Sequence, residues 1–439
     1  MAQGFDPAAA TAAYLAALTP AEHLKAQHYT QGGHWLLLWG ALVAVVVAWL
    51  ILRSGVLARV RARVEARRRR PALAVAAVIA VASIAEFVLT LPWSSYAEWW
   101  RETRYGLTSQ GYGGWLGEQA ITLVINAVMV MIVMQLVYLL IRRAPRTWWL
   151  WSGGVVSVFF VFVLVVSPIL IEPLFNSYKP APPGPIRDAI VQMAKANGVP
   201  SGKIVIYDGS KQSNRYTANV SGLFGTARIA MSDVMFKQNA DLAEVKAVVG
   251  HEMGHYVEGH ALRMAAEFGV LAFIAFFLVD RLYPHVLRLT GATRVGPISD
   301  PAGYPVISMT LSVLVLLGTP ILSSITRIGE AQADAYSMVH VNEPDGMARA
   351  LVKTIEYRAA TPGRLEEMLL YDHPSVGSRV RKAMDWKAAH PPLPPTQSGG
   401  GGPSAERSEE PMVEGVTVNA APSLAPSTAR SSASGAPSP

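Results

Sequence analysis

Long apolar segments alternate with polar loops along most of the chain. They lie at 35–52, 72–91, 121–141, 148–171, 264–282 and 306–325. Each approaches the roughly 20 residues that a helix needs to cross the hydrocarbon core of a bilayer. Trp148 and Trp149 open the fourth segment, as in the aromatic belts of membrane interfaces. The pattern predicts six membrane-spanning helices.

Between the fourth and fifth apolar segments the pattern changes to that of a water-facing fold. Residues 186–197 have the spacing of an amphipathic helix that ends at Gly198. Alternating residues at 203–207 and 228–231 predict two short strands, and residues 240–249 return to helical spacing. This stretch therefore predicts a small β-element followed by a helix.

These patterns divide the chain into six consecutive parts. We expect an N-terminal segment at 1–33, a membrane domain at 34–171, a water-facing segment at 172–262, a membrane hairpin at 263–325, further helices at 326–390 and a tail at 391–439. Thr19 and Pro20 predict a helix start inside the first part. The tail is rich in Pro, Ser, Ala and Gly without periodicity, which is typical of disorder.

Composition supports a membrane protein and restricts its chemistry. Apolar residues make up 51% of the 439 residues and charged residues only 16%. The chain has no cysteine, so disulfides and thiolate sites are excluded, and His and carboxylates remain as the strong zinc ligands. The net charge of +7 is concentrated in arginines at 53–70, beside an apolar segment. We therefore expect contact with the lipid bilayer and no nucleic acid. The sequence does not indicate an oligomeric state.

The chemistry is concentrated in the segment 248–255. His251 and His255 are four residues apart, about one helical turn, so both imidazoles can reach one zinc ion. Glu252 is offset from them and is placed to take a proton from a metal-bound water. The alternative is a chance match on an ordinary helix.

A catalytic zinc ion takes three protein ligands and keeps one open position. Glu330, in a helical segment after the sixth apolar segment, is the best candidate for the third ligand. Asp334 lies one turn further on the same face and could accept a hydrogen bond from a ligand imidazole. A solvated helix face is the alternative, but two acids at this spacing among alanines favour a site for one zinc ion per chain.

Taken together, these motifs resemble those of a family of membrane proteases. HEMGH at 251–255, followed beyond a membrane hairpin by ExxAD at 330–334, is similar to the integral-membrane zinc metalloproteases that include the type I CAAX prenyl proteases and bacterial HtpX. The similarity is collinear over roughly residues 73–386. It includes LPWSSY at 91–96, RYGL at 104–107, IEPLF at 171–175, DGSK at 208–211, HYVEGH at 255–260, and DHP at 372–374 with Arg379.

The resemblance implies both a fold and residue roles. The expected fold is mainly α: a polytopic bundle of six to seven membrane helices enclosing a zincin-type metalloprotease domain with a small β-element. His251, His255 and Glu330 match the zinc ligands, Glu252 the general base and Asp334 the supporting acid. His373 and Arg379 match residues near the substrate backbone and the oxyanion, where hydrogen-bond donors are needed. Without the family, a helix-start turn is the simpler interpretation of His373-Pro374.

Two residues, Asn219 and His260, each have two alternative roles. The family has an asparagine in the strand after the DGSK-like loop, and a gap-free alignment places Thr217 there. Asn219 lies two residues on, and therefore on the same face of a strand. We predict that Asn219 takes the family's catalytic role, with a purely structural role as the alternative. His260 could be a fourth ligand, but a helix cap or core contact is the stronger expectation.

The predicted function is a membrane-embedded zinc metalloendopeptidase that cleaves membrane-associated or lipidated polypeptides. CAAX-type processing and quality control of membrane proteins are both compatible with the sequence. The alternative is a membrane scaffold or transporter with a non-catalytic zinc site, although both Glu252 and Glu330 are present.

Orientation in the membrane depends on two arguments that disagree. The composition favours a bacterial inner membrane. Six spans place the arginine-rich loop at 53–70 on the side opposite the site, so the positive-inside rule puts the site outside the cytoplasm. The resembling families place the site in the cytoplasm, and we favour that side because the resemblance is extensive.

Overall fold

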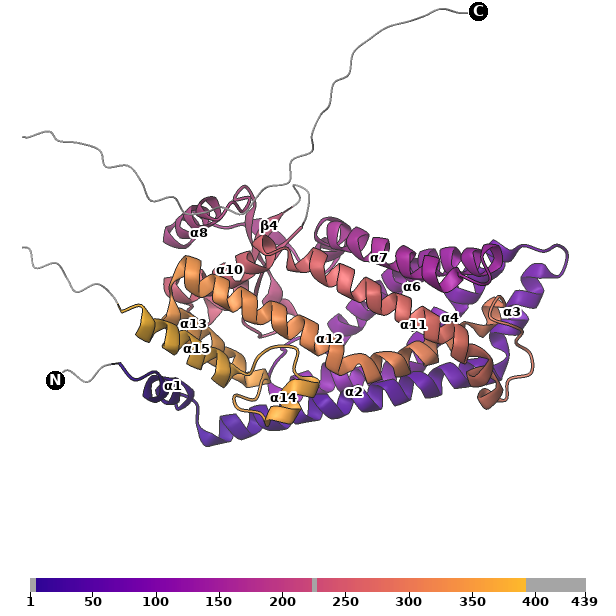
Figure 1. Ribbon diagram of the computed structural model, residues 1–439, viewed down its shortest axis with the longest axis horizontal. Coiled ribbons are helices and arrows are strands. Elements are labelled where there is room, and N and C mark those ends of the chain that lie inside the picture. Colours follow the sequence, from indigo (N-terminus) through magenta and orange to yellow (C-terminus); the bar gives the residue numbers. More distant parts are fainter. Residues whose placement is uncertain (1–4, 223–226, 392–439) are drawn as a thin grey trace, which may run out of the picture. The chain divides into compact units, whose positions relative to one another are not determined.

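The computed structural model describes residues 5–222 and 227–391, so the predicted tail lies, from residue 392, outside the described residues. Six helical segments within these ranges are long and apolar enough to cross a membrane, as the sequence predicts (Figure 1). They are α2 (Pro20–Ser54); α4 (Pro71–Ser94) continued through η1 (Ser95–Trp100) and α5 (Arg101–Tyr105); α6 (Tyr112–Arg143); α7 (Trp148–Val166) continued through η2 (Ser167–Ile171) and η3 (Glu172–Leu174); α11 (His260–Thr290); and η5 (Pro301–Gly303) with α12 (Tyr304–Val341).

The first long helix begins well before its apolar part. Thr19 caps α2 through a capping box with Glu22, and Pro20 occupies the first helical position, where its missing N–H costs nothing. The helix then continues without a break until Gly55, which adopts a left-handed conformation. Three of the proposed divisions of the chain, at 33/34, 262/263 and 325/326, lie inside the continuous helices α2, α11 and α12.

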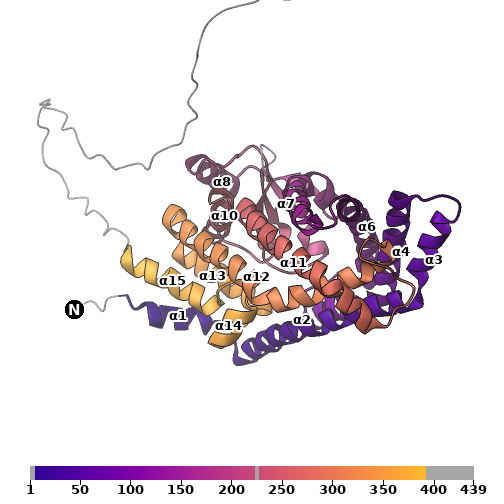
Figure 2. The same cartoon turned by 45° about the vertical axis from the view of Figure 1, so that its right-hand side comes forward.

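The long helices pack around an apolar core. α11 packs against α7, α12 against α2 and α11, and α4 against α6. Tyr138, Trp148 and Val306 are fully buried members of this core, one from each of three helices. The arginine-rich helix α3 (Val56–Glu65) lies at the end of these helices remote from α13 and α15 (Figures 1 and 2).

A small sheet forms the β-element. Its strands, β1 (Tyr178–Pro180), β2 (Ile204–Tyr207), β3 (Ala218–Ser221) and β4 (Arg228–Ser232), are arranged in the order β1-β2-β4-β3. β2 and β4 are the two predicted strands, and they pair in parallel. The edge strand β1 was not predicted, whereas β3 contains Asn219, for which the resemblance implied a strand. The predicted helix before β2 is α8 (Pro185–Ala196).

The motif helix α10 (Leu242–Val257) connects the sheet to the membrane helices. It packs against β3, α8, α12 and α13. The remaining elements are α1 (Pro7–Leu15), η4 (Gly209–Lys211), α9 (Asp233–Lys237), α13 (Pro344–Lys353), η6 (Thr354–Tyr357), α14 (Arg364–Leu370) and α15 (Val376–Ala389). The predicted fold class, a mainly α membrane bundle with a protease domain and a small β-element, is confirmed.

Candidate metal centre

The helix α10 begins at a strong cap and lies unusually close to α12. The Asp241 carboxylate accepts the Glu244 backbone N–H at 2.8 Å, which satisfies a free donor of the first turn. At Gly254, a Cβ would lie 2.9 Å from the Tyr336 Cβ and 3.1 Å from the Ala333 Cα, both on α12. The absence of a side chain at Gly254 therefore allows the two helices to approach within backbone contact.

Three side chains from these two helices converge on one point. His251 and His255 of α10 and Glu330 of α12 place ligand atoms within 4.8 Å of one another. The Nε2 atoms of His251 and His255 are 3.2 Å apart. His251 Nε2 lies 3.2 Å from Glu330 Oε2, and His255 Nε2 lies 3.4 Å from Glu330 Oε1. Zinc bonds of about 2.0–2.2 Å separate tetrahedral ligand atoms by roughly 3.3–3.6 Å. These three donors, all predicted from the sequence, thus have nearly the spacing that one zinc ion requires.

His251 is supported by a buried ion pair. Its Nδ1 lies 2.9 Å from Asp334 Oδ1, and Arg379 donates from Nε and Nη2 to both Asp334 oxygens at 2.7 Å. All three residues are buried. Burial lowers the pKa of His251, but hydrogen bonds to Asp334 and Glu330 outweigh it and raise the pKa to about 9. A hydrogen bond from Nδ1 to Asp334 leaves Nε2 as the nitrogen directed at the metal position.

His255 is supported by a second imidazole. Its Nδ1 lies 2.9 Å from Nδ1 of His260, which is 1% exposed and opens α11. Gly259, with a φ of 64°, separates α10 from α11 and turns His260 back toward His255. Sequence reasoning expected a cap or core contact for His260 and did not foresee this hydrogen bond.

Glu252 is half-buried beside the metal group. Burial raises its pKa, and the neighbouring His251 and His255 lower it by a smaller amount. A backbone hydrogen bond to Val220 also ties Glu252 to β3. Glu252 is not one of the three converging donors, which agrees with its angular offset on the helix.

His373 reaches the same group from the loop between α14 and α15. Its Nε2 lies 3.2 Å from Glu330 Oε2, and its Nδ1 lies 2.8 Å from Asp372 Oδ1. The loop is fastened to α12 because Arg327 donates to the carbonyls of Glu367 and Tyr371. The structure therefore brings His373 together with the metal group, as the resemblance implies.

Arg379 contacts a different group from the one that its implied role requires, whereas the role of Asn219 stays a prediction. Arg379 directs Nε and Nη2 at Asp334, so these donors are engaged away from any oxyanion. Asn219 lies in β3 opposite Ala230, and its Oδ1 is buried without a hydrogen-bond partner among the described residues. Thr217 is exposed and precedes β3. Within residues 5–222 and 227–391, no hydrogen bond joins Asn219 to the metal group.

Two protein-family models match almost the entire folded part of the chain. One, described as the CAAX prenyl protease N-terminal domain with five membrane helices, matches residues 8–177. The other, peptidase family M48, matches residues 180–387. Residues 180–387 are therefore similar to peptidase family M48. The chain is thus a membrane-embedded metallopeptidase, although the described residues of 8–177 hold four membrane-length helices rather than five.

Curated relatives are similar to this chain over most of their own lengths. A Bacillus subtilis protein described as uncharacterized metalloprotease YhfN is 26% identical over 83% of this chain and 86% of its own length. CAAX prenyl protease 1 of Saccharomyces cerevisiae is 26% identical over 68% of this chain and 69% of its own length. The crystal structure of S. mikatae Ste24p matches with a TM-score of 0.69 at 21% identity, over 84% of this chain and 89% of that one. This last likeness confirms the fold.

Proposed function

We propose that this chain is an endopeptidase that binds one zinc ion through His251, His255 and Glu330 and uses Glu252 as general base. The spacing of the three donor atoms carries the proposal. The buried hydrogen bond from His251 Nδ1 to Asp334 supports it, because partners of this kind fix the orientation of metal-binding histidines.

Each catalytic group has a defined task in peptide hydrolysis. A bound zinc ion would acidify the attacking water and polarise the substrate carbonyl. Glu252 accepts the proton of that water and later gives it to the leaving amine. His373 can donate a hydrogen bond toward the carbonyl oxygen from its place beside Glu330.

Asn219 is the proposed second donor to the substrate, since its amide is half-buried on the strand that packs against α10. Exchange of Asn219 for Ala should lower kcat/KM by about tenfold or more. Undiminished peptidase activity would reduce Asn219 to a structural residue.

The decisive experiment is Glu252→Gln in the full chain, with Glu258→Gln on the exposed end of the same helix as the matched control. Glu252→Gln should retain about one zinc ion per chain and lose cleavage by a factor of 100 or more, because general base catalysis contributes 10²–10⁴-fold. Glu258→Gln should leave both unchanged. Cellular function that survives Glu252→Gln would favour the scaffold or transporter alternative, which the comparisons do not support.

Membrane-bound or lipidated polypeptides are the proposed substrates. Relatives named CAAX prenyl proteases support lipidated chains, whereas quality control would require only membrane-bound ones. Cleavage of one peptide with and without a prenyl group distinguishes these classes. A preference of tenfold or more for the prenylated peptide would favour CAAX-type processing.

The proposed location is a bacterial inner membrane with the metal site facing the cytoplasm. Resemblance to the cytoplasm-facing family supports this side, whereas the arginines of α3, remote from α13 and α15, point to the opposite orientation. Reporter fusions after residue 391 would decide between them, since a periplasmic reporter signal would place the site outside the cytoplasm.

A further inference from the structure

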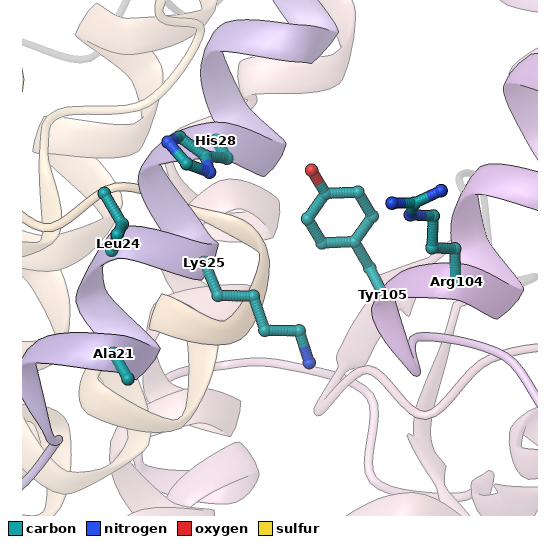
Figure 3. Close-up of a pocket in the computed structure, with 6 residues that line it drawn as sticks. All are labelled: Ala21, Leu24, Lys25, His28, Arg104 and Tyr105. Carbon is teal, nitrogen blue, oxygen red and sulfur yellow. The ribbon is translucent and has the colours of Figure 1, made fainter.

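A basic cavity lies beside the start of the first long helix. It has a volume of about 360 Å³, within the roughly 300–1,000 Å³ of small-ligand pockets, and residues of α2 and α5 line it. On α2, Lys25 and His28 face Tyr105 of α5, with Arg104 beside it (Figure 3). The described residues of this lining include none of the metal group, so the cavity is separate from the proposed catalytic site.

The cavity carries positive charge without an acidic neighbour. Lys25 and Arg104 line it, and none of its lining residues in the described ranges is acidic. The nearest acids along the chain are engaged elsewhere, Glu22 in the cap of α2 and Glu102 in an ion pair with Arg215 at 2.6 Å. The uncompensated charge of the cavity therefore attracts an anion.

Both cations have unused hydrogen-bond donors. In the described part of the chain, neither Lys25 nor Arg104 forms an ion pair or a side-chain hydrogen bond, and Arg104 only stacks on the Trp100 ring at 5.2 Å. A Cβ at Gly106 would lie 4.0 Å from the Lys25 Nζ, so α5 ends beside this ammonium group. An ammonium and a guanidinium together suit a phosphate, whose several oxygens accept charge-assisted hydrogen bonds.

The length of α2 places the cavity at the depth of the lipid headgroups. Lys25 and Arg53 lie about 42 Å apart along the axis of this helix. A bilayer with its headgroup regions is about 40–45 Å thick, so these two residues reach opposite headgroup layers. Trp35, on α2, and Trp100, beside Arg104, are both exposed, as aromatic side chains at membrane interfaces are.

The cavity belongs to the leaflet nearer to the metal group. Thr30, two residues after His28, accepts the Ala359 backbone N–H at 2.8 Å, and α2 packs against η6. The chain continues from η6 through α14 to His373, which lies 3.2 Å from Glu330. A ligand of this cavity would therefore come from the lipids on the side of the membrane that the metal group faces.

We propose that this cavity binds the phosphate diester of an anionic phospholipid, with Lys25 and Arg104 as its principal partners. The Tyr105 hydroxyl can donate to the same group. Leu24, which is 51% exposed at the rim, offers an apolar contact to the lipid beyond its phosphate. A free phosphate ion has the same charge chemistry but would gain nothing from Leu24 or from the depth of the cavity. The inference goes beyond the proposed function, because it requires neither zinc nor cleavage.

The first test uses the absence of cysteine from the chain. Ala21→Cys at the rim of the cavity can carry a fluorophore, which a phospholipid with a nitroxide near its headgroup quenches on contact. With the full chain in phosphatidylcholine vesicles, nitroxide-labelled phosphatidylglycerol should reach half-maximal quenching at about a tenfold lower fraction than nitroxide-labelled phosphatidylcholine. Lys25→Gln with Arg104→Gln should remove most of this preference. The charge-conserving pair Lys25→Arg with Arg104→Lys should keep most of it.

The arginines that follow α3 provide a matched control. Arg67→Gln with Arg68→Gln also removes two exposed positive charges, but at the other end of the membrane helices. This pair should leave the preference at the Ala21→Cys probe unchanged, because the distance greatly exceeds the Debye length of about 8–10 Å. A second probe at Ala66→Cys should respond equally with and without Lys25→Gln and Arg104→Gln, which shows that the cavity variant folds and enters vesicles.

Three outcomes overturn the proposal. Equal quenching by the two lipids in the wild-type background would mean that the cavity does not select an anionic lipid. Equal losses from the cavity pair and from the control pair, or loss of the preference in the charge-conserving pair, would leave only a general attraction of a basic protein to an anionic surface. Displacement of phosphatidylglycerol by low millimolar inorganic phosphate would assign the cavity to a soluble phosphate compound instead.

Discussion

Behind His251 the structure places a carboxylate and a guanidinium, whereas behind His255 it places another imidazole. The first support connects three separate elements, since His251 lies on α10, Asp334 on α12 and Arg379 on α15. The second connects residues only five positions apart across the junction of α10 and α11. The two ligands of one metal site thus depend on contacts of very different range.

Loss of the Asp334–Arg379 pair and loss of the His260 contact should therefore have different consequences. A buried ion pair that joins distant segments exists only after the chain has folded, and loss of one partner leaves an unpaired buried charge. A hydrogen bond between two imidazoles is weaker, and its loss leaves no buried carboxylate or guanidinium without a partner. We therefore expect the region behind His251 to affect both folding and metal binding, and the region behind His255 to affect mainly metal binding.

Breaking the ion pair should have the largest effect. Asp334→Ala or Arg379→Met should each lower the free energy of unfolding by about 3–5 kcal/mol, because the remaining partner is buried and charged. The double variant should recover much of the lost stability, since no unpaired charge remains, but not the metal affinity, since His251 still lacks its acceptor. Thermal unfolding in detergent and zinc content measure the two quantities separately.

The helix α15 itself offers a control for this prediction. Arg381 and Asp385 form an ion pair at 2.8 Å in which both side chains are half exposed to solvent. Asp385→Ala should therefore cost less than about 1 kcal/mol. If Asp334→Ala cost no more than Asp385→Ala, the pair behind His251 would not carry the folding role argued here.

Disrupting the contact between α10 and α12 should have the next largest effect on stability. A methyl group at position 254 would press on Tyr336 and on the backbone of Ala333, so Gly254→Ala should destabilise the fold by about 1–3 kcal/mol. It should also weaken zinc binding, because α12 carries Glu330 and Asp334. Gly318→Ala, on α12, is the control, since no atom lies within 4 Å of its added Cβ. Equal stability of the two variants would contradict the close contact at Gly254.

The same distinction between local and distant contacts explains what the sequence could predict. Six apolar segments and the i, i+4 spacing of His251 and His255 are local patterns, and they indicated the spans and the motif helix. Glu330 could be predicted because the two histidines leave a catalytic zinc ion one ligand short, and because this acid lies among small residues in a helical segment. The edge strand β1 has only three residues, too few for alternation to distinguish it from a loop, and β3 was expected from the resemblance alone.

The contacts that lie behind the ligands were harder to predict. Arg379 resembled an oxyanion residue in its motif, and only the packing of α15 against α12 reveals that its donors point at Asp334. The contact between His260 and His255 depends on the left-handed Gly259, and the Gly-His dipeptide in the sequence was a signal that could have suggested it.

Removal of the His260 imidazole, which contacts His255, should have the smallest effect. His260→Ala should weaken zinc binding about tenfold, at the lower end of the range for groups that orient metal ligands, while the unfolding midpoint of the zinc-free chain changes little. His260→Asn, which can still accept a hydrogen bond, should restore part of the affinity. Competition with a chelator measures the affinity, and the absorption of the cobalt-substituted chain reports whether the ligand set is kept. Loss of zinc as complete as in His255→Ala, with an altered cobalt spectrum, would make His260 a ligand. A loss of stability as large as that of Asp334→Ala would mean that the two regions behind the histidines do not differ in the way their contacts imply.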